Sequence, residues 1–150
     1  MSTTLQVART TLLPGLLKTA QANRKMPLPL RLFEISDVVL RDATKDVGAK
    51  NQRNLAALNY DKSPRFEVIH GLLDRLMQLL EVPPASAPGA PDGYFLRGCD
   101  DDTYFPGRCA EIVACGMPVG RLGVLHPETV TKFDLTLPCA AMEINLEPFL

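Results

Sequence analysis

The sequence predicts an α+β fold that combines a local antiparallel hairpin with amphipathic helices. Residues 109–114 and 119–125 are short apolar runs on either side of a turn at Gly116, a pattern typical of two paired strands. Residues 12–20 and 66–80 instead carry apolar side chains at helical spacing. A chain of 150 residues with 46% hydrophobic residues suits one domain with a modest core, so residues 1–150 are treated as one domain.

The predicted hairpin has features that restrict how its strands pair. Pro118, Gly120 and Gly123 favour an edge position, a bulge or a close backbone contact over a freely extending central strand. Pro127 follows the second strand where the first residue of a helix is expected, and Glu128 lies in the first turn, where an acid meets unpaired N–H groups. The hairpin is therefore expected to lead directly into a helix.

Residues 30–40 are the strongest strand candidate. Their apolar side chains occupy both alternating positions of a strand, which predicts burial on both faces and a place in the middle of the sheet. Glu34 and Asp37 then need partners, because a carboxylate inside a central strand is costly when it is unpaired. Either an arginine holds them structurally or they belong to a ligand site. Residues 54–60 are expected to return beside this strand, and residues 139–146 to form the last strand.

The helix of residues 12–20 is expected to begin at a threonine cap, Thr10 or Thr11. It should end near residues 23–26, because prolines follow and basic side chains there suit the negative end of the helix dipole. The sequence thus predicts a short amphipathic helix.

The second helix is expected to begin with Ser63 as its cap and Pro64 at its first position. Gly71 lies on its polar side and costs about 1 kcal/mol of helix stability relative to alanine. We therefore expect another group to approach the backbone at Gly71.

Charge excludes one broad class of function. A net charge of −1 and a pI near 6.1 argue against a protein that grips nucleic acid over its whole surface. Residues 1–53 carry nine Lys and Arg and four Asp and Glu, a net charge of +5. Residues 54–150 carry seven Lys and Arg and thirteen Asp and Glu, a net charge of −6. We interpret the basic part mainly as solvated faces, with an acidic partner as the alternative.

The sequence carries no sign of a membrane or secreted protein. No apolar run approaches the roughly 20 residues that span a bilayer, and the first residues lack a signal peptide's regions, so we expect a cytoplasmic protein. Cys99, Cys109, Cys115 and Cys139 include neither a CxxC pair nor a histidine at metal-ligand spacing. They are expected to be reduced, mostly buried thiols. The acids of residues 100–102 are expected to be solvated, because a calcium site needs spaced ligands.

Six segments together carry a family resemblance. They are ARTTLLPGLLKTAQAN, PLRLFEISDVVL, FEVIHGLLDRLMQLL, FPGRCAEI, VGRLGVLHPETV and MEINLEPFL. In this order they resemble the C-terminal catalytic-like domain of the beta subunit of phenylalanyl-tRNA synthetase, cytosolic and archaeal type, from about Val7 to Leu150. The resemblance implies a class II aminoacyl-tRNA synthetase-like antiparallel sheet flanked by helices. It also implies a fragment of a longer chain, truncated at its N-terminal side after the motif 1 region.

In that family the alpha subunit performs the chemistry, and the beta domain is a degenerate relative of it. Arg41 is similar in position to the motif 2 arginine that approaches ATP phosphate. Residues 55–60 lack the glutamate and glutamine of motif 2, and nothing after His126 resembles the glycine-rich motif 3. The resemblance therefore implies no catalytic, cofactor-binding or metal-binding residues in this chain, and ATP and Mg for the holoenzyme only.

We therefore expect a structural and partner-binding domain that is not an independent enzyme. The resemblance implies an alpha-subunit partner in a heterotetramer of two alpha and two beta subunits. It also implies tRNA as a partner of the holoenzyme, which attaches phenylalanine to its tRNA using ATP. The chain alone is expected to show no phenylalanine-dependent pyrophosphate exchange.

Two alternatives stay open from the sequence. The first is a surviving nucleotide site made of charged and histidine side chains: Glu34, Arg41, Arg108 and His126. The second is an RNA-contacting module that uses cations of the basic N-terminal third: Arg9, Lys18, Arg24, Lys25 and Arg31. RNA binding of this kind would weaken steeply with salt.

Two expectations concern packing. Arg108 follows a Pro-Gly turn and precedes a buried strand, so we expect it to brace Glu34 or Glu111 and not a ligand. The leucines of residues 12–20 form a stripe wider than one sheet contact requires, and Leu150 ends an apolar tail. Since the motif 1 region is missing, we expect this surface to be exposed, and the chain alone to self-associate or to be marginally stable.

Overall fold

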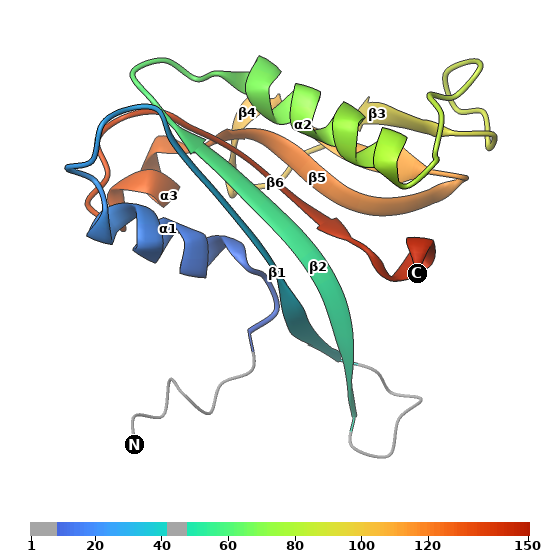
Figure 1. Ribbon diagram of the computed structural model, residues 1–150, viewed down its shortest axis with the longest axis horizontal. Coiled ribbons are helices and arrows are strands. Elements are labelled where there is room, and N and C mark those ends of the chain that lie inside the picture. The colour runs from blue at the N-terminus through green and yellow to red at the C-terminus, as the bar shows by residue number, and fades with distance from the viewer. Residues whose placement is uncertain (1–8, 42–47) are drawn as a thin grey trace.

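The computed structural model describes residues 9–41 and 48–150. These residues form one six-stranded antiparallel sheet in the order β1-β2-β6-β5-β4-β3, with helices on both faces (Figure 1). The strands are β1 (Leu30–Arg41), β2 (Ala49–Tyr60), β3 (Tyr94–Gly98), β4 (Tyr104–Ala114), β5 (Met117–Leu125) and β6 (Cys139–Asn145). The helices are α1 (Leu13–Ala22), α2 (Phe66–Leu79), α3 (Pro127–Thr131) and the 3-10 turn η2 (Glu147–Phe149). The predicted α+β class is confirmed.

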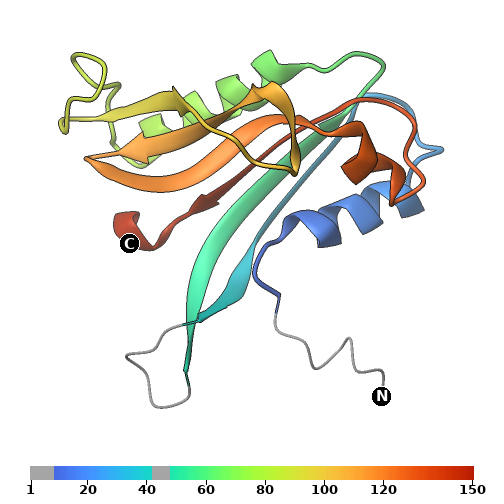
Figure 2. The ribbon, with the colours of Figure 1, turned by 180° about the vertical axis from the view of Figure 1, so that it is seen from behind.

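The strand β6 joins two parts of the sheet. β1 and β2 form a long hairpin, and α2 then leads to the opposite edge, where β3, β4 and β5 form a meander. After α3 the chain returns as β6 between β2 and β5. Seen from behind, α1 and α3 lie close together on the same side of the sheet (Figure 2). The last strand predicted from the sequence is therefore the central one.

Two hydrophobic cores fill the two faces of the sheet. Neighbouring residues of a strand point to opposite faces, so Leu58 of β2 packs with α1 and Leu55 packs with α2. The helical stripe on the α1 side is at most 6% exposed at each position: Leu12, Leu13, Leu16, Leu17 and Ala20. The expectation that this stripe is exposed is wrong, because Val38 of β1 and Val130 of α3 complete the same core.

The strand β1 lies at the edge of the sheet, so the predicted central position of residues 30–40 is wrong. One set of alternate side chains faces α1, where Val38 is fully buried. The opposite set includes Phe33 and Ile35, which are 71% and 51% exposed. Because α2 packs over β2, β5 and β6, it leaves this outer strand uncovered (Figure 1). The apolar pattern on both sides of β1 therefore marks one buried face and one apolar surface.

The β4–β5 hairpin confirms the predicted turn. Cys115 and Gly116 both have positive φ, 53° and 80°, as tight hairpin turns require. The register shifts just before the turn, where a bulge was one of the predicted options. β5 is nevertheless a central strand, and its glycines allow close neighbours: a Cβ on Gly120 would lie 2.2 Å from the backbone oxygen of Glu143.

The helix α2 begins at Phe66, so the predicted start at Ser63 and Pro64 is wrong. Arg65 occupies the N-cap position with ψ of 64°, outside the helical range, so the helix cannot start earlier. Gly71 is exposed, and no neighbouring atom lies within 4 Å of the position a Cβ would take there. The expected approach of another group to this glycine is therefore also wrong.

The shorter helices follow their sequence signals more closely. α3 begins at Pro127 as predicted, and Nδ1 of His126 accepts a hydrogen bond from the backbone N–H of Glu128 at 3.1 Å. α1 ends at Ala22, and the guanidinium of Arg24 donates to the carbonyl of Gln21 at 3.2 Å, as expected at a helix C-terminus. Within the described residues, no helix is long and apolar enough to cross a membrane.

Candidate functional site

A cavity of about 740 Å³ lies on the α1 face of the sheet. It lies between the start of α1, the strands β2, β5 and β6, and the loop before β4. Carboxylates dominate the charged lining, which is Asp101, Asp102, Glu111, Glu143, Arg121 and Lys132. The charged groups that line the cavity therefore carry a net negative charge.

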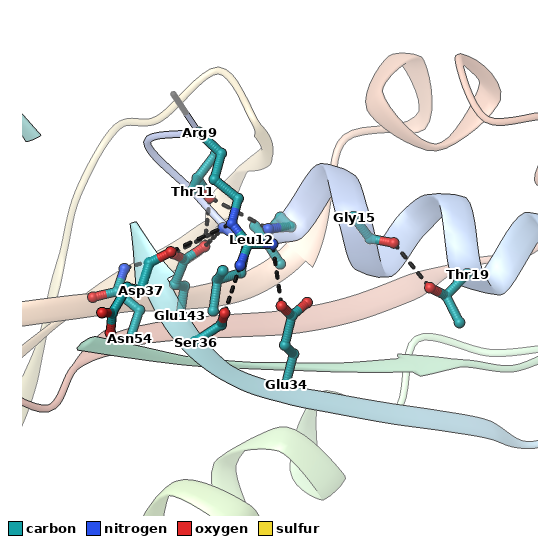
Figure 3. Close-up of polar contacts among 11 residues, drawn as sticks. Arg9, Thr11, Leu12, Gly15, Thr19, Glu34, Ser36, Asp37, Asn54 and Glu143 are labelled. Atoms are coloured by element: carbon teal, nitrogen blue, oxygen red, sulfur yellow. Dashed lines mark hydrogen bonds and ion pairs between the residues drawn. The ribbon is translucent and has the colours of Figure 1, made fainter. Parts of the chain in front are cut away.

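Glu143 of β6 holds the first turn of α1 against the sheet (Figure 3). Both carboxylate oxygens accept from the backbone N–H of Leu12 at 3.0 Å, and the Thr11 hydroxyl also donates to this carboxylate. The side-chain amide of Asn54 on β2 donates to it at 2.7 Å. One half-buried carboxylate thus connects a helix and two neighbouring strands.

The predicted threonine cap of α1 is wrong, because Leu12 occupies the N-cap position and makes no side-chain cap hydrogen bond. Thr11 Oγ1 accepts from the backbone N–H of Leu13 at 3.4 Å, a long contact. The shorter bonds come from Glu143, which lies more than a hundred residues away in the sequence. An acid at this position also suits the positive end of the helix dipole. The cap is therefore a tertiary interaction, which local sequence rules do not describe.

Arg9 is the partner that Glu34 needs (Figure 3). Its guanidinium pairs with Glu34 at 3.2 Å and also donates to the Ser36 hydroxyl and the Asp37 carbonyl, the latter at 3.3 Å. The backbone N–H of Val39 donates to the Arg9 carbonyl at 2.9 Å, which fixes this segment on the outer edge of β1. The interpretation that an arginine holds Glu34 structurally is confirmed.

Asp101 in the loop before β4 is paired and not merely solvated, so the expectation for this acid is wrong. Arg121 of β5 donates to it at 2.7 Å, and the backbone N–H of Thr103 donates at 3.0 Å. Burial alone would raise the pKa of Asp101, but these two hydrogen bonds outweigh it, and the pKa is lowered. The pair ties the loop to the central sheet at the rim of the cavity.

The residues of the nucleotide alternative do not come together. Glu34 and Arg41 occupy opposite faces of β1, seven positions or roughly 23 Å apart along the strand. Arg108 lines a separate apolar cavity of about 330 Å³, and His126 caps α3 beside a third hollow. These positions do not form one phosphate-binding surface.

The expected brace at Arg108 is also wrong. Glu34 pairs with Arg9, and Glu111 pairs with Arg97 through its Nε at 2.7 Å. Among the described residues Arg108 makes no ion pair. Its side chain is exposed in the irregular stretch of residues 105–108, which lies unpaired between the pairs Tyr104–Leu125 and Cys109–Gly123 of β4 and β5.

The cations of the RNA alternative are spread over both faces of the sheet. Arg9 and Arg24 are engaged on the α1 side, as described above, whereas Arg31 donates to Asn59 at 3.1 Å on the α2 side. Lys18 and Lys25 are exposed on and just after α1. Three of the five candidate residues therefore serve internal contacts.

Sequence reasoning missed Glu143 as an organising residue, although it left one signal. Glu143 is the sole charged side chain in the otherwise apolar run of residues 139–144. A carboxylate in such a strand needs donors, which the structure supplies from α1 and β2. Among the described residues, no three histidine, cysteine or acidic side chains are grouped closely enough to hold a metal ion.

Substituting Glu143→Gln should lower stability by about 1–3 kcal/mol, because a glutamine NH₂ would face the donors of Leu12, Thr11 or Asn54. Urea unfolding of both proteins measures this difference. Glu67→Gln is the matched control, since Glu67 is an exposed acid whose one ion pair is 3.9 Å long. Equal stabilities of the Glu143 variant and the control would show that the carboxylate does not hold the helix.

Comparison with known proteins shows which sequences this chain is similar to. The sequence pattern of the family described as "Phenylalanyl tRNA synthetase beta chain CLM domain" matches residues 1–146. The chain is 65% identical over 145 residues to the mouse phenylalanine–tRNA ligase beta subunit, covering 97% of this chain and 24% of that protein. It is 59% identical over 144 residues to the Drosophila melanogaster beta subunit, with 96% and 24% covered.

A plant relative shows the same partial coverage. The chain is 41% identical over 155 residues to the Arabidopsis thaliana protein named "Phenylalanine--tRNA ligase beta subunit, cytoplasmic", covering 99% of this chain and 26% of the relative. The chain thus spans about a quarter of the length of these relatives. By its sequence, the chain belongs to the phenylalanyl-tRNA synthetase beta chain CLM domain family.

Proposed function

We propose that the chain is a non-catalytic, structural and partner-binding domain of a phenylalanine–tRNA ligase beta subunit, and that it acts in the cytoplasm. The holoenzyme would attach phenylalanine to its tRNA using ATP. Family membership supports the assignment to the beta subunit. The names of the relatives call them beta subunits, which supports an alpha subunit as partner. The heterotetramer of two alpha and two beta subunits, and its binding of tRNA, belong to the same proposal.

The exposed apolar face of β1 is the observation that carries the partner-binding role. Phe33 and Ile35 lie two positions apart on one face of an edge strand, and both are more than half exposed. Exposed aromatic and aliphatic neighbours on a strand edge favour association, because water is then excluded from them. We propose that the alpha subunit covers this face. The chain alone is expected to self-associate through it.

The charged groups of the α1-face cavity support a non-catalytic role. Glu143 and Asp101 are engaged in holding α1 and the loop before β4. Four carboxylates and two cations line the cavity, and Arg121 is already paired, so its lining disfavours a triphosphate. These residues do not fit ATP with Mg, and we assign both to the alpha subunit.

The fold supports the catalytic-like part of the proposal. An antiparallel sheet flanked by helices, with a long β1–β2 hairpin that carries Arg41 at its end, is what the resemblance to a class II synthetase implies. We therefore propose a degenerate class II synthetase-like domain, in the C-terminal catalytic-like part of the beta subunit.

The purified chain should show no phenylalanine-dependent exchange of pyrophosphate into ATP, since its cavity carries no cationic cluster to neutralise the triphosphate. A complete phenylalanine–tRNA ligase measured in the same assay is the positive control. Exchange by the purified chain that persists through repeated chromatography would contradict the non-catalytic assignment.

Replacing Phe33 and Ile35 together by serine in a full-length beta chain carrying this domain should weaken its complex with the alpha subunit at least about tenfold. Thermal stability should stay close to that of the parent chain, because both side chains are largely exposed. Isothermal titration or quantitative co-purification gives the affinity.

Met117→Ser is the control, because Met117 is 53% exposed at the β4–β5 turn and not on β1. It should leave the affinity for the alpha subunit unchanged. If the Phe33 and Ile35 variant binds like the control, another surface of the domain meets the alpha subunit.

A further inference from the structure

Two cysteines that are ten positions apart in the sequence meet in the fold. The Sγ atoms of Cys99 and Cys109 are 2.9 Å apart, and both thiols are free. The β3–β4 register ends with Gly98 opposite Ala110, and one further step places Cys99 opposite Cys109. Directly opposed residues of antiparallel strands have Cα atoms about 4.5–5.5 Å apart, within the span that a disulfide bridges.

The pair is accessible to small molecules. Both cysteines are half-buried, and both line a cavity of about 430 Å³ together with Asp101, Asp102 and His126. The two other thiols of the chain are placed differently: Cys115 is exposed in the β4–β5 turn and Cys139 is fully buried in β6. The chain thus combines one thiol pair with two single thiols.

We propose that Cys99 and Cys109 are an oxidisable thiol pair, which forms a reversible disulfide by exchange with a low-molecular-weight disulfide such as oxidised glutathione. The chain's family and proposed function assign no role to these residues. The proposal rests on two observations: the two sulfur atoms face each other, and both cysteines line a cavity that small molecules can enter. Among the described residues there is no third metal ligand beside them, which disfavours a metal centre.

The exchange has two steps. The Cys99 thiol loses its proton and its sulfur attacks one sulfur of oxidised glutathione, whose S–S bond breaks and releases one reduced glutathione. The Cys109 thiol then loses its proton and attacks the Cys99 sulfur of the mixed disulfide, which releases a second reduced glutathione. Overall, two protein thiols are oxidised to one disulfide and one glutathione disulfide is reduced to two thiols.

The order of the steps follows from the surroundings of the two sulfurs. Burial, and then the hydrogen bond with Cys99, raises the pKa of the Cys109 thiol to about 12. A thiol with so little thiolate is a poor first nucleophile toward a dissolved disulfide. It can still attack Cys99 once the mixed disulfide holds that sulfur beside it, because the second step is intramolecular.

The disulfide would act on the loop between β3 and β4. Residues 99–103 carry Asp101, whose carboxylate pairs with Arg121 of β5 at the rim of the α1-face cavity. A bond from Cys99 to Cys109 would anchor the start of this loop to β4 and restrict its unfolding. Oxidation should therefore raise the thermal midpoint of the chain.

The test incubates the folded chain with oxidised glutathione, alkylates the remaining thiols and maps disulfides by peptide mass spectrometry. The expected product is one peptide pair that links Cys99 to Cys109, with the loss of both thiols and an upward shift in the thermal midpoint. Reduced glutathione in excess should restore both thiols. If Cys99 and Cys109 are still alkylated after the treatment with oxidised glutathione, as the exposed Cys115 is, no disulfide has formed between them and the proposal is overturned.

Three variants separate the thiol pair from general thiol reactivity. Cys109→Ser should trap glutathione on Cys99, because the second step is lost, whereas Cys99→Ser should leave Cys109, whose thiol pKa is raised by burial, less glutathionylated than Cys99 is in the first variant. Cys115→Ser is the matched control and should form the disulfide like the parent chain. In urea the preference for the Cys99 and Cys109 link should disappear; the same preference in urea would show that the fold does not select the pair.

Discussion

The carboxylate of Glu143 is the interaction on which the arrangement of this domain depends. It sits in β6, the strand that joins the β1–β2 hairpin to the β3–β4–β5 meander. It accepts from the first turn of α1 and from Asn54 on β2, so one side chain fixes a helix and two strands relative to one another. The neighbouring glycine of β5, Gly120, lets the backbones approach at the same level. Helix α1, once placed, buries its leucine stripe and covers β1 and β2 on one face of the sheet.

The two helices cover β1 differently on its two faces, and this asymmetry bears on function. The helix α2 covers the central strands of the other face and stops before β1, so the apolar side chains of Phe33 and Ile35 meet solvent. On the α1 side, by contrast, β1 is held by Arg9, whose guanidinium pairs with Glu34 and donates to the backbone carbonyl of Asp37. The polar contacts of Arg9 therefore stabilise the fold itself, while the exposed apolar side chains of Phe33 and Ile35 favour association with a partner.

Local patterns in the sequence predicted the elements that depend on local chemistry. The β4–β5 hairpin at Gly116 and the start of α3 at Pro127 were predicted correctly, because adjacent residues set this turn and this helix start. The starts of α1 and α2 were predicted incorrectly from the same kind of signal. The position of β1 in the sheet was predicted incorrectly. Apolar residues at both alternating positions occur on a central strand and also on an edge strand with one exposed apolar face, so the sequence pattern does not distinguish the two. The partners of Glu34 and Glu143 come from the segment before α1 and from β2, and Cys109 of β4 meets Cys99 just after the end of β3. No spacing rule in the sequence connects those positions.

Amide hydrogen exchange at Leu12 tests the central claim most directly. If the Glu143 carboxylate holds this N–H in the native state, the Leu12 amide should exchange as slowly as the hydrogen-bonded amides of β6, through unfolding of the whole domain. Amides at an uncapped helix start exchange through local fraying and report a much smaller opening free energy. A Leu12 amide that exchanges like an unprotected one while β6 remains protected would contradict the account.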